Sequence, residues 1–174
     1  MRNKRSLLVL SLVSLLGLSI AKADDDSHCF TLESFKGTYA IVAHYEGDIA
    51  IALGVRHFDD EGNLTGTFVL NEPEKGSTTG ARTILTGTQK GSISTLKCNG
   101  TGVITRTATA SNGMVTTTHD DFVVTRAIEK HGKLRVTAIQ DAQVTPSSLV
   151  SPPVLLTRVW TRVPHPNEEE EWEQ

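Results

Sequence analysis

The sequence predicts an all-β protein, in which a single antiparallel meander closes into an eight-stranded barrel. Threonine is unusually frequent, with 22 residues in a chain of 174, and valine and isoleucine are common. Such β-branched residues favour the pleated strand. Turn signals recur about every eight to fifteen residues, and no long segment has helical periodicity. A meander leaves exposed edges unless it closes, so we expect a barrel, with a β-sandwich as the alternative.

The first two predicted strands form a hairpin. Residues 37–46 alternate in polarity, and four of their side chains share one face: Tyr39, Ile41, Ala43 and Tyr45. A tight turn at Gly47 and Asp48 leads into residues 49–58. Four aliphatic residues and a histidine share one face of that second strand: Ile49, Ile51, Leu53, Val55 and His57.

The later strands follow in order, separated by turn formers. A loop rich in Asp, Gly and Asn at residues 59–63 leads into a strand at residues 64–70. Residues 81–90 and 92–97 form two strands, or one bent strand with a bulge at Gly91. The remaining strands are predicted at residues 101–110, 114–126, 133–142 and 154–163.

Residues 1–23 have the pattern of a secretory signal peptide. A basic start (Arg2, Lys4 and Arg5) precedes an apolar run, which ends in the cleavage signal Ala21-Lys22-Ala23. The apolar run is too short to cross a bilayer comfortably. We therefore expect export to a periplasm or secretion, a barrel domain at residues 24–166 and an acidic, disordered tail at residues 167–174.

The charge distribution excludes several classes of partner. The first 23 residues hold four of the 17 basic residues and none of the 20 acidic ones, which leaves a net charge of −7 for the rest. Eight acids lie in the two ends of that remainder, so the body is near neutral. A nucleic-acid surface needs a clustered basic stripe, and a transmembrane barrel needs aromatic girdles. The chain has neither, so we expect no nucleic acid and no stable membrane insertion.

Two cysteines, Cys29 and Cys98, make up the whole complement of thiols. An even number of cysteines in an oxidising compartment indicates a disulfide. The alternative, a metal-bound or nucleophilic thiol, has weak support because the two residues lie far apart and form no CxxC motif. A bridge here would pin the start of the exported chain onto the body of the domain.

Three short segments together resemble a family of small secreted bacterial proteins with a calycin-like barrel, akin to that of allene oxide cyclase. They are Gly37-Thr38-Tyr39-Ala40, the hairpin at residues 58–66, and Cys98-Asn99-Gly100-Thr101, in the expected order. The resemblance covers about residues 30–140. Members of that family usually carry a second GTY motif followed closely by a DCxGT motif. At the corresponding places this chain has Gly87-Thr88-Gln89 and Lys97-Cys98-Asn99. The resemblance implies the barrel fold and no catalytic residue, because most members have no known activity.

Motifs for catalysis and for cofactors are absent from the sequence, so we expect no catalytic residue, cofactor or resident metal. His44 and Glu46 share a strand face and form a conceivable acid–base pair, while His57 lies too far along the hairpin to share a metal with His44. The segment His119-Asp120-Asp121 is a second small cluster. The loop at residues 59–63 is rich in oxygen ligands for calcium, although a hairpin needs the same residues. Asn63 and Asn99 begin glycosylation sequons.

The lumen is the remaining candidate site. We expect Tyr39, Ile41, Tyr45, Phe68 and Trp160 to line it, with Ala43, Ala108, Val136 and Ala138 also facing inward. Eight-stranded barrels either fill with side chains or hold one small ligand, and small lining residues leave room for one. Three hypotheses follow: a barrel that binds a small apolar or amphipathic molecule without turnover, a structural or interaction barrel with a filled core, and a cyclase or isomerase acting on a lipid-like substrate.

Overall fold

The computed structural model describes residues 29–164, apart from residue 147 and residues 151–153. Eight antiparallel strands close into one barrel in chain order, with the last strand paired to the first. Two short 3-10 turns, η2 (Leu32–Phe35) and η3 (Glu46–Asp48), accompany them. The strands are β1 (Gly37–Tyr45), β2 (Ile51–Phe58), β3 (Asn63–Pro73), β4 (Arg82–Leu96), β5 (Thr101–Ala110), β6 (Val115–Lys130), β7 (Lys133–Gln143) and β8 (Leu156–Arg162). The predicted barrel is confirmed, and the sandwich alternative is excluded.

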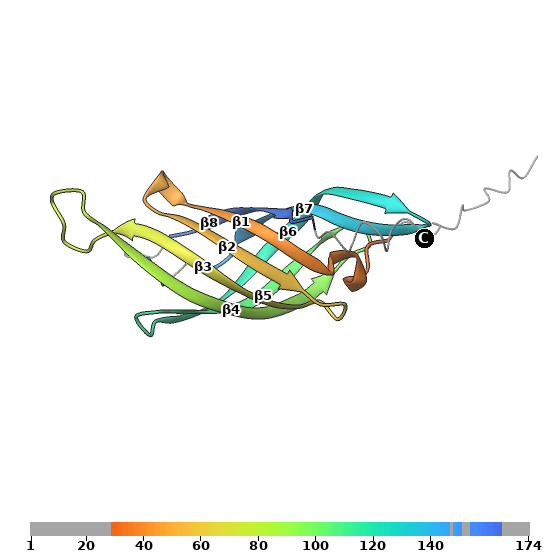
Figure 1. Ribbon diagram of the computed structural model, residues 1–174, viewed down its shortest axis with the longest axis horizontal. Helices are drawn as coiled ribbons and strands as arrows, with labels where there is room; N and C mark the ends of the chain where they lie inside the picture. The colour runs from red at the N-terminus through yellow and green to blue at the C-terminus, as the bar shows by residue number, and fades with distance from the viewer. Residues whose placement is uncertain (1–28, 147, 151–153, 165–174) are drawn as a thin grey trace, which may run out of the picture.

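The strands run along the length of the molecule, so the connections gather at its two ends (Figure 1). One end carries the β1–β2, β3–β4, β5–β6 and β7–β8 connections, and is called the loop end. The other carries η2 and the β2–β3, β4–β5 and β6–β7 turns, and is called the capped end. Within the described part of the chain, no helix has the length and apolar character needed to cross a membrane. The predicted signal peptide and acidic tail lie outside the described residues.

β4 is a single long strand, and its irregularity lies at Ser94 rather than at Gly91, where we expected a bulge. Gly91 pairs regularly with Leu64 and Arg106. The register with β5 shifts between Ile93 and Thr95. The hydroxyl of Ser94 donates a hydrogen bond to the carbonyl of Val103 at 3.2 Å. The extra residue in the ladder is therefore one whose side chain bonds to the partner strand.

A disulfide between Cys29 and Cys98 confirms the predicted bridge. It joins the segment before β1 to the β4–β5 turn, and the amide of Phe30 donates to the carbonyl of Cys98 at 3.2 Å. The chain then enters η2, which carries the fully buried side chain of Phe35 into the capped end. The disulfide thus holds η2, with the buried ring of Phe35, against this end of the barrel.

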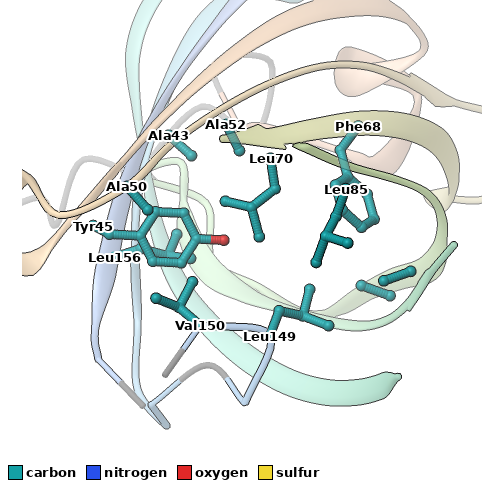
Figure 2. Packing of buried hydrophobic residues seen from close by; sticks show 12 residues of the cluster. Ala43, Tyr45, Ala50, Ala52, Phe68, Leu70, Leu85, Leu149, Val150 and Leu156 are labelled. Carbon is teal, nitrogen blue, oxygen red and sulfur yellow. The ribbon is translucent and has the colours of Figure 1, made fainter. Parts of the chain in front are cut away.

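Two separate apolar clusters fill the lumen. The cluster at the capped end is rich in aromatic rings, with Phe58 and Trp160 stacked at 5.7 Å between centroids. The cluster at the loop end is built from alanines and aliphatic residues, and Leu149 and Val150 of the β7–β8 connection pack into it (Figure 2). Both ends of the barrel are therefore occupied by the protein's own side chains.

A register shift in β7 corrects one inward assignment. Val136 is fully buried as expected, but Ala138 is only half-buried, and Ile139 takes the inward position instead. The β6–β7 ladder is irregular between Val124 and Ala127, opposite this stretch. One extra residue in a strand moves every following side chain to the other face.

The continuous aliphatic face of β2 points outward. Ile51, Leu53 and Val55 are exposed, and Leu53 keeps 56% of its surface. The inward face of the same strand carries, in order, Ala52, Gly54, Arg56 and Phe58. Hydrophobicity alone would assign these two faces the other way round.

Candidate functional site: a charged layer inside the barrel

Five charged side chains lie buried in the middle of the lumen, between the two apolar clusters. They come from five different strands, and each sits at an inward position of its strand. We call this set the central layer: Arg56, Arg106, Asp120, Asp141 and Arg158. Each keeps 5% or less of its surface exposed. Charges this deep are costly unless they are paired and hydrogen-bonded.

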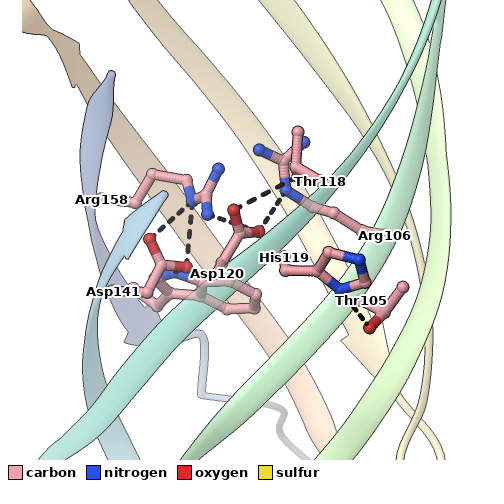
Figure 3. Close-up of polar contacts among 8 residues, drawn as sticks. Thr105, Arg106, Thr118, His119, Asp120, Asp141 and Arg158 are labelled. Carbon is pink, nitrogen blue, oxygen red and sulfur yellow. Dashed lines mark hydrogen bonds and ion pairs between the residues drawn. The ribbon is translucent and has the colours of Figure 1, made fainter. Parts of the chain in front are cut away.

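Asp120 is the centre of the layer (Figure 3). Its Oδ2 accepts a hydrogen bond from Nε of Arg106 at 2.6 Å and lies 2.6 Å from Nη2 of Arg158. Its Oδ1 accepts a hydrogen bond from the hydroxyl of Thr118 at 3.2 Å. One carboxylate therefore joins arginines from β5 and β8, on either side of its own strand β6.

Asp141 forms the second carboxylate site. Nε of Arg158 donates to both of its oxygens, at 2.8 and 3.0 Å. The indole Nε1 of Trp160 donates to Oδ2 of the same carboxylate at 2.8 Å. Arg158 thus bridges Asp120 and Asp141, and Trp160 connects the charged layer to the aromatic cluster.

Arg56 differs from the other two arginines because no carboxylate of the described residues lies within ion-pair distance of it. Its guanidinium carbon lies 4.3 Å from the centroid of the Trp160 ring, in a cation–π contact. Its Nη1 atom is buried and has no hydrogen-bond partner among the described residues. This is the one arginine of the central layer whose charge the described carboxylates do not contact directly.

Burial and pairing shift the pKa values of the layer in directions that follow its geometry. Burial alone would raise the pKa of Asp120, but the positive charges of Arg158 and Arg106 outweigh it and hold that pKa below its usual value. For Arg56, burial lowers the pKa well below the usual value, and the neighbouring charges of Arg158 and Arg106 lower it further. Arg158 shifts in the other direction, because the negative charges of Asp141 and Asp120 outweigh its burial and raise its pKa.

The enclosed space beside this layer is small. A cavity of about 20 Å³ lies against Arg56, Gln89, Arg106 and Arg158, and both apolar clusters contribute to its walls. A single water needs roughly 10–15 Å³ measured in this way. The cavity therefore has room for one water or one single-atom ion, and not for an organic ligand.

All five predicted lining residues are buried in the lumen, but they divide into two groups. Ile41, Tyr45 and Phe68 border the small cavity. Tyr39 and Trp160 belong to the packed aromatic cluster instead. The hydroxyl of Tyr39 donates to the carbonyls of Phe35 and Val136, at 2.9 and 3.1 Å, which fixes it as part of the core. Their binding of a ligand stays a prediction.

The polar clusters proposed from the sequence are divided between the two faces of the barrel, and of their members only His44 and Asp121 line a common outer pocket, of about 490 Å³, among the described residues. His44 pairs with Ile51 across the β1–β2 hairpin, on the outer surface, and Glu46 has left the strand for η3. His57 contacts Thr38, and His119 contacts Thr105, again on the outside. Asp120 is the one member of its cluster that faces the lumen, away from its neighbours in sequence.

The loop at residues 59–63 acts as a hairpin turn. The carboxylate of Asp59 accepts hydrogen bonds from the amides of Glu61 and Asn63, at 3.0 and 2.8 Å, and from the Asn63 side chain at 2.9 Å. These bonds also lower the pKa of Asp59. Across residues 29–164 as described, no group of three or more His, Cys, Asp and Glu side chains is placed to hold a metal ion.

The sequence reading missed the central layer, although the signal was present. Arg106 sits in phase with inward Ile104 and Ala108, and Arg158 sits in phase with Leu156 and Trp160. A charged residue at an inward position of an alternating strand is the pattern that reveals such a layer. This pattern indicates a buried charged layer only when several strands carry an inward-facing charged residue.

The outer surface of the barrel carries a second candidate site. Four aliphatic residues on neighbouring strands lie side by side in the ladder: Val159, Val42, Leu53 and Val69. A groove of about 660 Å³ opens over β2 to β5, and we call it the outer groove. Its lining combines aliphatic side chains with hydroxyl groups: Leu53, Gly54, Val55, Thr67, Phe68, Val69, Thr86, Gly87, Thr88, Thr109, Ala110 and Ser111.

No protein-family model matches the chain, and no curated protein matches its sequence.

Proposed function

We propose that this protein is a non-catalytic binding barrel, which takes a small apolar or amphipathic molecule in the outer groove while its lumen serves as a filled core. The observation that carries the proposal is the contrast between two volumes. The cavity in the lumen measures about 20 Å³, whereas the outer groove, which is open to solvent, measures about 660 Å³. Sites for small molecules usually measure about 300–1,000 Å³.

The lining of the outer groove fits a ligand of mixed character. Leu53, Val55 and Val69 offer aliphatic contact, and all three are well exposed. Threonine and serine hydroxyls provide hydrogen-bond donors and acceptors along its other side. No charged side chain lines the groove, so we expect a neutral ligand with an apolar body and a hydroxyl or carbonyl group.

The same lining argues for binding without turnover. None of the residues that line the groove is a histidine, a carboxylate, a cysteine or a lysine. Proton transfer in catalysis relies on side chains of these kinds. The two aspartates of the lumen are held in ion pairs with Arg106 and Arg158, beside a space too small for a substrate. A cyclase or isomerase acting inside the barrel has no support from this geometry.

We further propose that the protein works after export and is related to the calycin-like barrels. The disulfide supports export because such bonds persist in oxidising compartments. The closed eight-stranded meander supports the kinship because it is the fold that the resemblance implies.

The binding experiment uses a neutral apolar fluorophore such as Nile red, titrated into the purified full chain. Leu53→Lys and Val69→Lys place charges in the groove, and we expect each to weaken binding about tenfold or more. Ile128→Lys is the matched control, because Ile128 is an exposed aliphatic residue on β6, outside the groove. Mass spectrometry of the denatured protein from its native host is expected to find a bound compound.

Two results would overturn the proposal. One is dye binding that is equal in the parent protein and in all three variants. The other is a change in oligomeric state with Leu53→Lys or Val69→Lys, measured by light scattering, with no specific dye uptake. That second result would make the aliphatic face a subunit interface rather than a ligand site.

A further inference from the structure

The central layer has an imbalance of charge that the side chains of the described residues do not correct. Among the residues that the structure describes, the buried charged side chains are three arginines and two aspartates. Arginine stays protonated in proteins. The layer therefore carries one positive charge in excess, in a region sealed by apolar clusters at both ends. An uncompensated buried charge is among the most costly features a fold can contain.

The excess charge is centred on Arg56. Each of the other two arginines contacts a carboxylate at 2.6–2.8 Å. Arg56 has the face of Trp160 on one side, and its Nη1 atom is buried without a partner among the described residues. The side chain is 3% exposed, so bulk solvent does not supply the missing acceptor.

The small cavity lies where such an acceptor is needed. Arg56, Arg106 and Arg158 all border it, and no carboxylate does. Gln89 borders it too, and its side-chain oxygen is buried without a hydrogen-bond partner in the part of the chain that the structure describes. The two ends of a carboxamide have nearly the same shape. Turned by 180°, Gln89 presents an N–H₂ donor to the same space.

The size of the cavity decides what can occupy it. At about 20 Å³ it holds one water-sized particle, which excludes phosphate, sulfate and any organic acid. A water molecule would satisfy the hydrogen bond of Arg56 Nη1 but would leave the extra charge in place. A single-atom anion supplies both the acceptor and the missing negative charge.

We propose that the lumen contains a binding site for one halide ion, chloride in the natural setting, held by Arg56 and Gln89 within the arginine-rich wall of the cavity. The ion completes the central layer as three positive and three negative charges. This site is inside the barrel, independent of the outer groove and of any ligand bound there.

The first test measures thermal stability of the intact protein against chloride at constant ionic strength, with gluconate as the replacing anion. An ion at ten times its dissociation constant raises the melting temperature of a domain of this size by about 3–6 °C. We expect such a rise with chloride and bromide. Arg56→Met removes the charge while keeping a long side chain, and we expect it to abolish the rise.

Lys90→Met is the matched control for this variant. Lys90 lies next to Gln89 on β4 but faces outward. The substitution therefore removes one positive charge, as Arg56→Met does, but from the outer surface. We expect Lys90→Met to keep the chloride response of the parent protein. A loss of the response in both variants would assign it to surface charge and overturn the site.

The second test needs no variant and remains decisive if Arg56→Met fails to fold. Crystals of the parent protein grown in bromide are expected to show an anomalous-scattering peak in the cavity, beside Arg56 Nη1. A water in that place with no bromide peak would overturn the proposal. So would a melting temperature that is the same in chloride and in gluconate.

Discussion

The Nη2 atom of Arg158 on β8 lies 2.6 Å from Oδ2 of Asp120 on β6, although these two strands are not neighbours in the barrel. Strand β7 lies between them and contributes Asp141, which Arg158 also contacts. The pair therefore spans part of the lumen and joins three consecutive strands through their side chains. Loss of either partner would leave the other buried with one counter-charge fewer, because Arg158 would keep only Asp141 and Asp120 would keep only Arg106.

The first prediction concerns Asp120→Asn. This change leaves Arg106 and Arg158 buried with one carboxylate fewer, and removing one partner of a buried ion pair costs about 3–5 kcal/mol. We expect a loss of that size in the free energy of unfolding, measured by urea denaturation. Asp121→Asn is the control, because Asp121 is the next residue and faces outward. Its effect should stay within about 0.5 kcal/mol, and equal effects of the two changes would contradict the central role of Asp120.

The second prediction concerns acid pH. The pKa of Asp120 is lower in the folded protein than in the unfolded chain, where it is about 3.9. Its contribution to stability is therefore fully present above the unfolded pKa and is lost as the pH falls through the folded pKa. We expect the unfolding free energy to fall below about pH 4. The slope of that fall should be smaller in Asp120→Asn, and a slope equal to that of the parent protein would show that other carboxylates are responsible.

The third prediction concerns the disulfide. The bridge closes a segment with a sequence separation of 69 residues, and the chain-entropy model assigns a loop of that size about 4 kcal/mol. We expect the double variant Cys29→Ser, Cys98→Ser to lose stability of this order in urea denaturation. Titration of the unfolded, unreduced parent protein should find no free thiol. Two reactive thiols per chain would contradict the bridge.

The fourth prediction concerns Gly87, which lies beneath the ring of Phe68. A Cβ atom at this position would come within 2.3 Å of Phe68 Cζ and 2.4 Å of the Thr109 carbonyl oxygen. We expect Gly87→Ala to cost about 1–3 kcal/mol, because the sheet has no space for it. Thr88→Ala, on the outward face of the same strand, is the control. A neutral Gly87→Ala would show that this corner of the barrel is less tightly packed than described.

The sequence was sufficient to predict the barrel because alternation and turn chemistry act locally. The loop at residues 59–63, for example, forms its hairpin through bonds from Asp59 to residues at most four positions away. The disulfide was also predictable, because two cysteines behind a predicted signal peptide leave few alternatives. The bulge in β4 was predicted at the wrong residue for a local reason. A glycine such as Gly91 is the usual sign of a bulge, but here the hydroxyl of Ser94 bonds to the carbonyl of Val103 on the partner strand.

The site was harder to predict because it depends on which face of each strand turns inward. On β2 the aliphatic face lies outside and the face with Arg56 lies inside, the reverse of the usual arrangement. That choice is made by the whole ring of strands, in which Arg56 gains Trp160 from β8. No local pattern in β2 contains this information. The outer groove escaped notice for the same reason, since it is visible only when aliphatic faces of several strands adjoin.

The central layer also makes the alignment of the strands unique. A shift of β6 by two residues would keep the same side chains facing inward. It would, however, bring Phe122 to the level now held by Asp120 and move Asp120 into one of the apolar clusters. Such a shift would separate Asp120 from Arg106 and Arg158, and a buried charge that loses its partner is strongly destabilising. The buried ion pairs therefore favour the observed alignment of the strands over a shifted one.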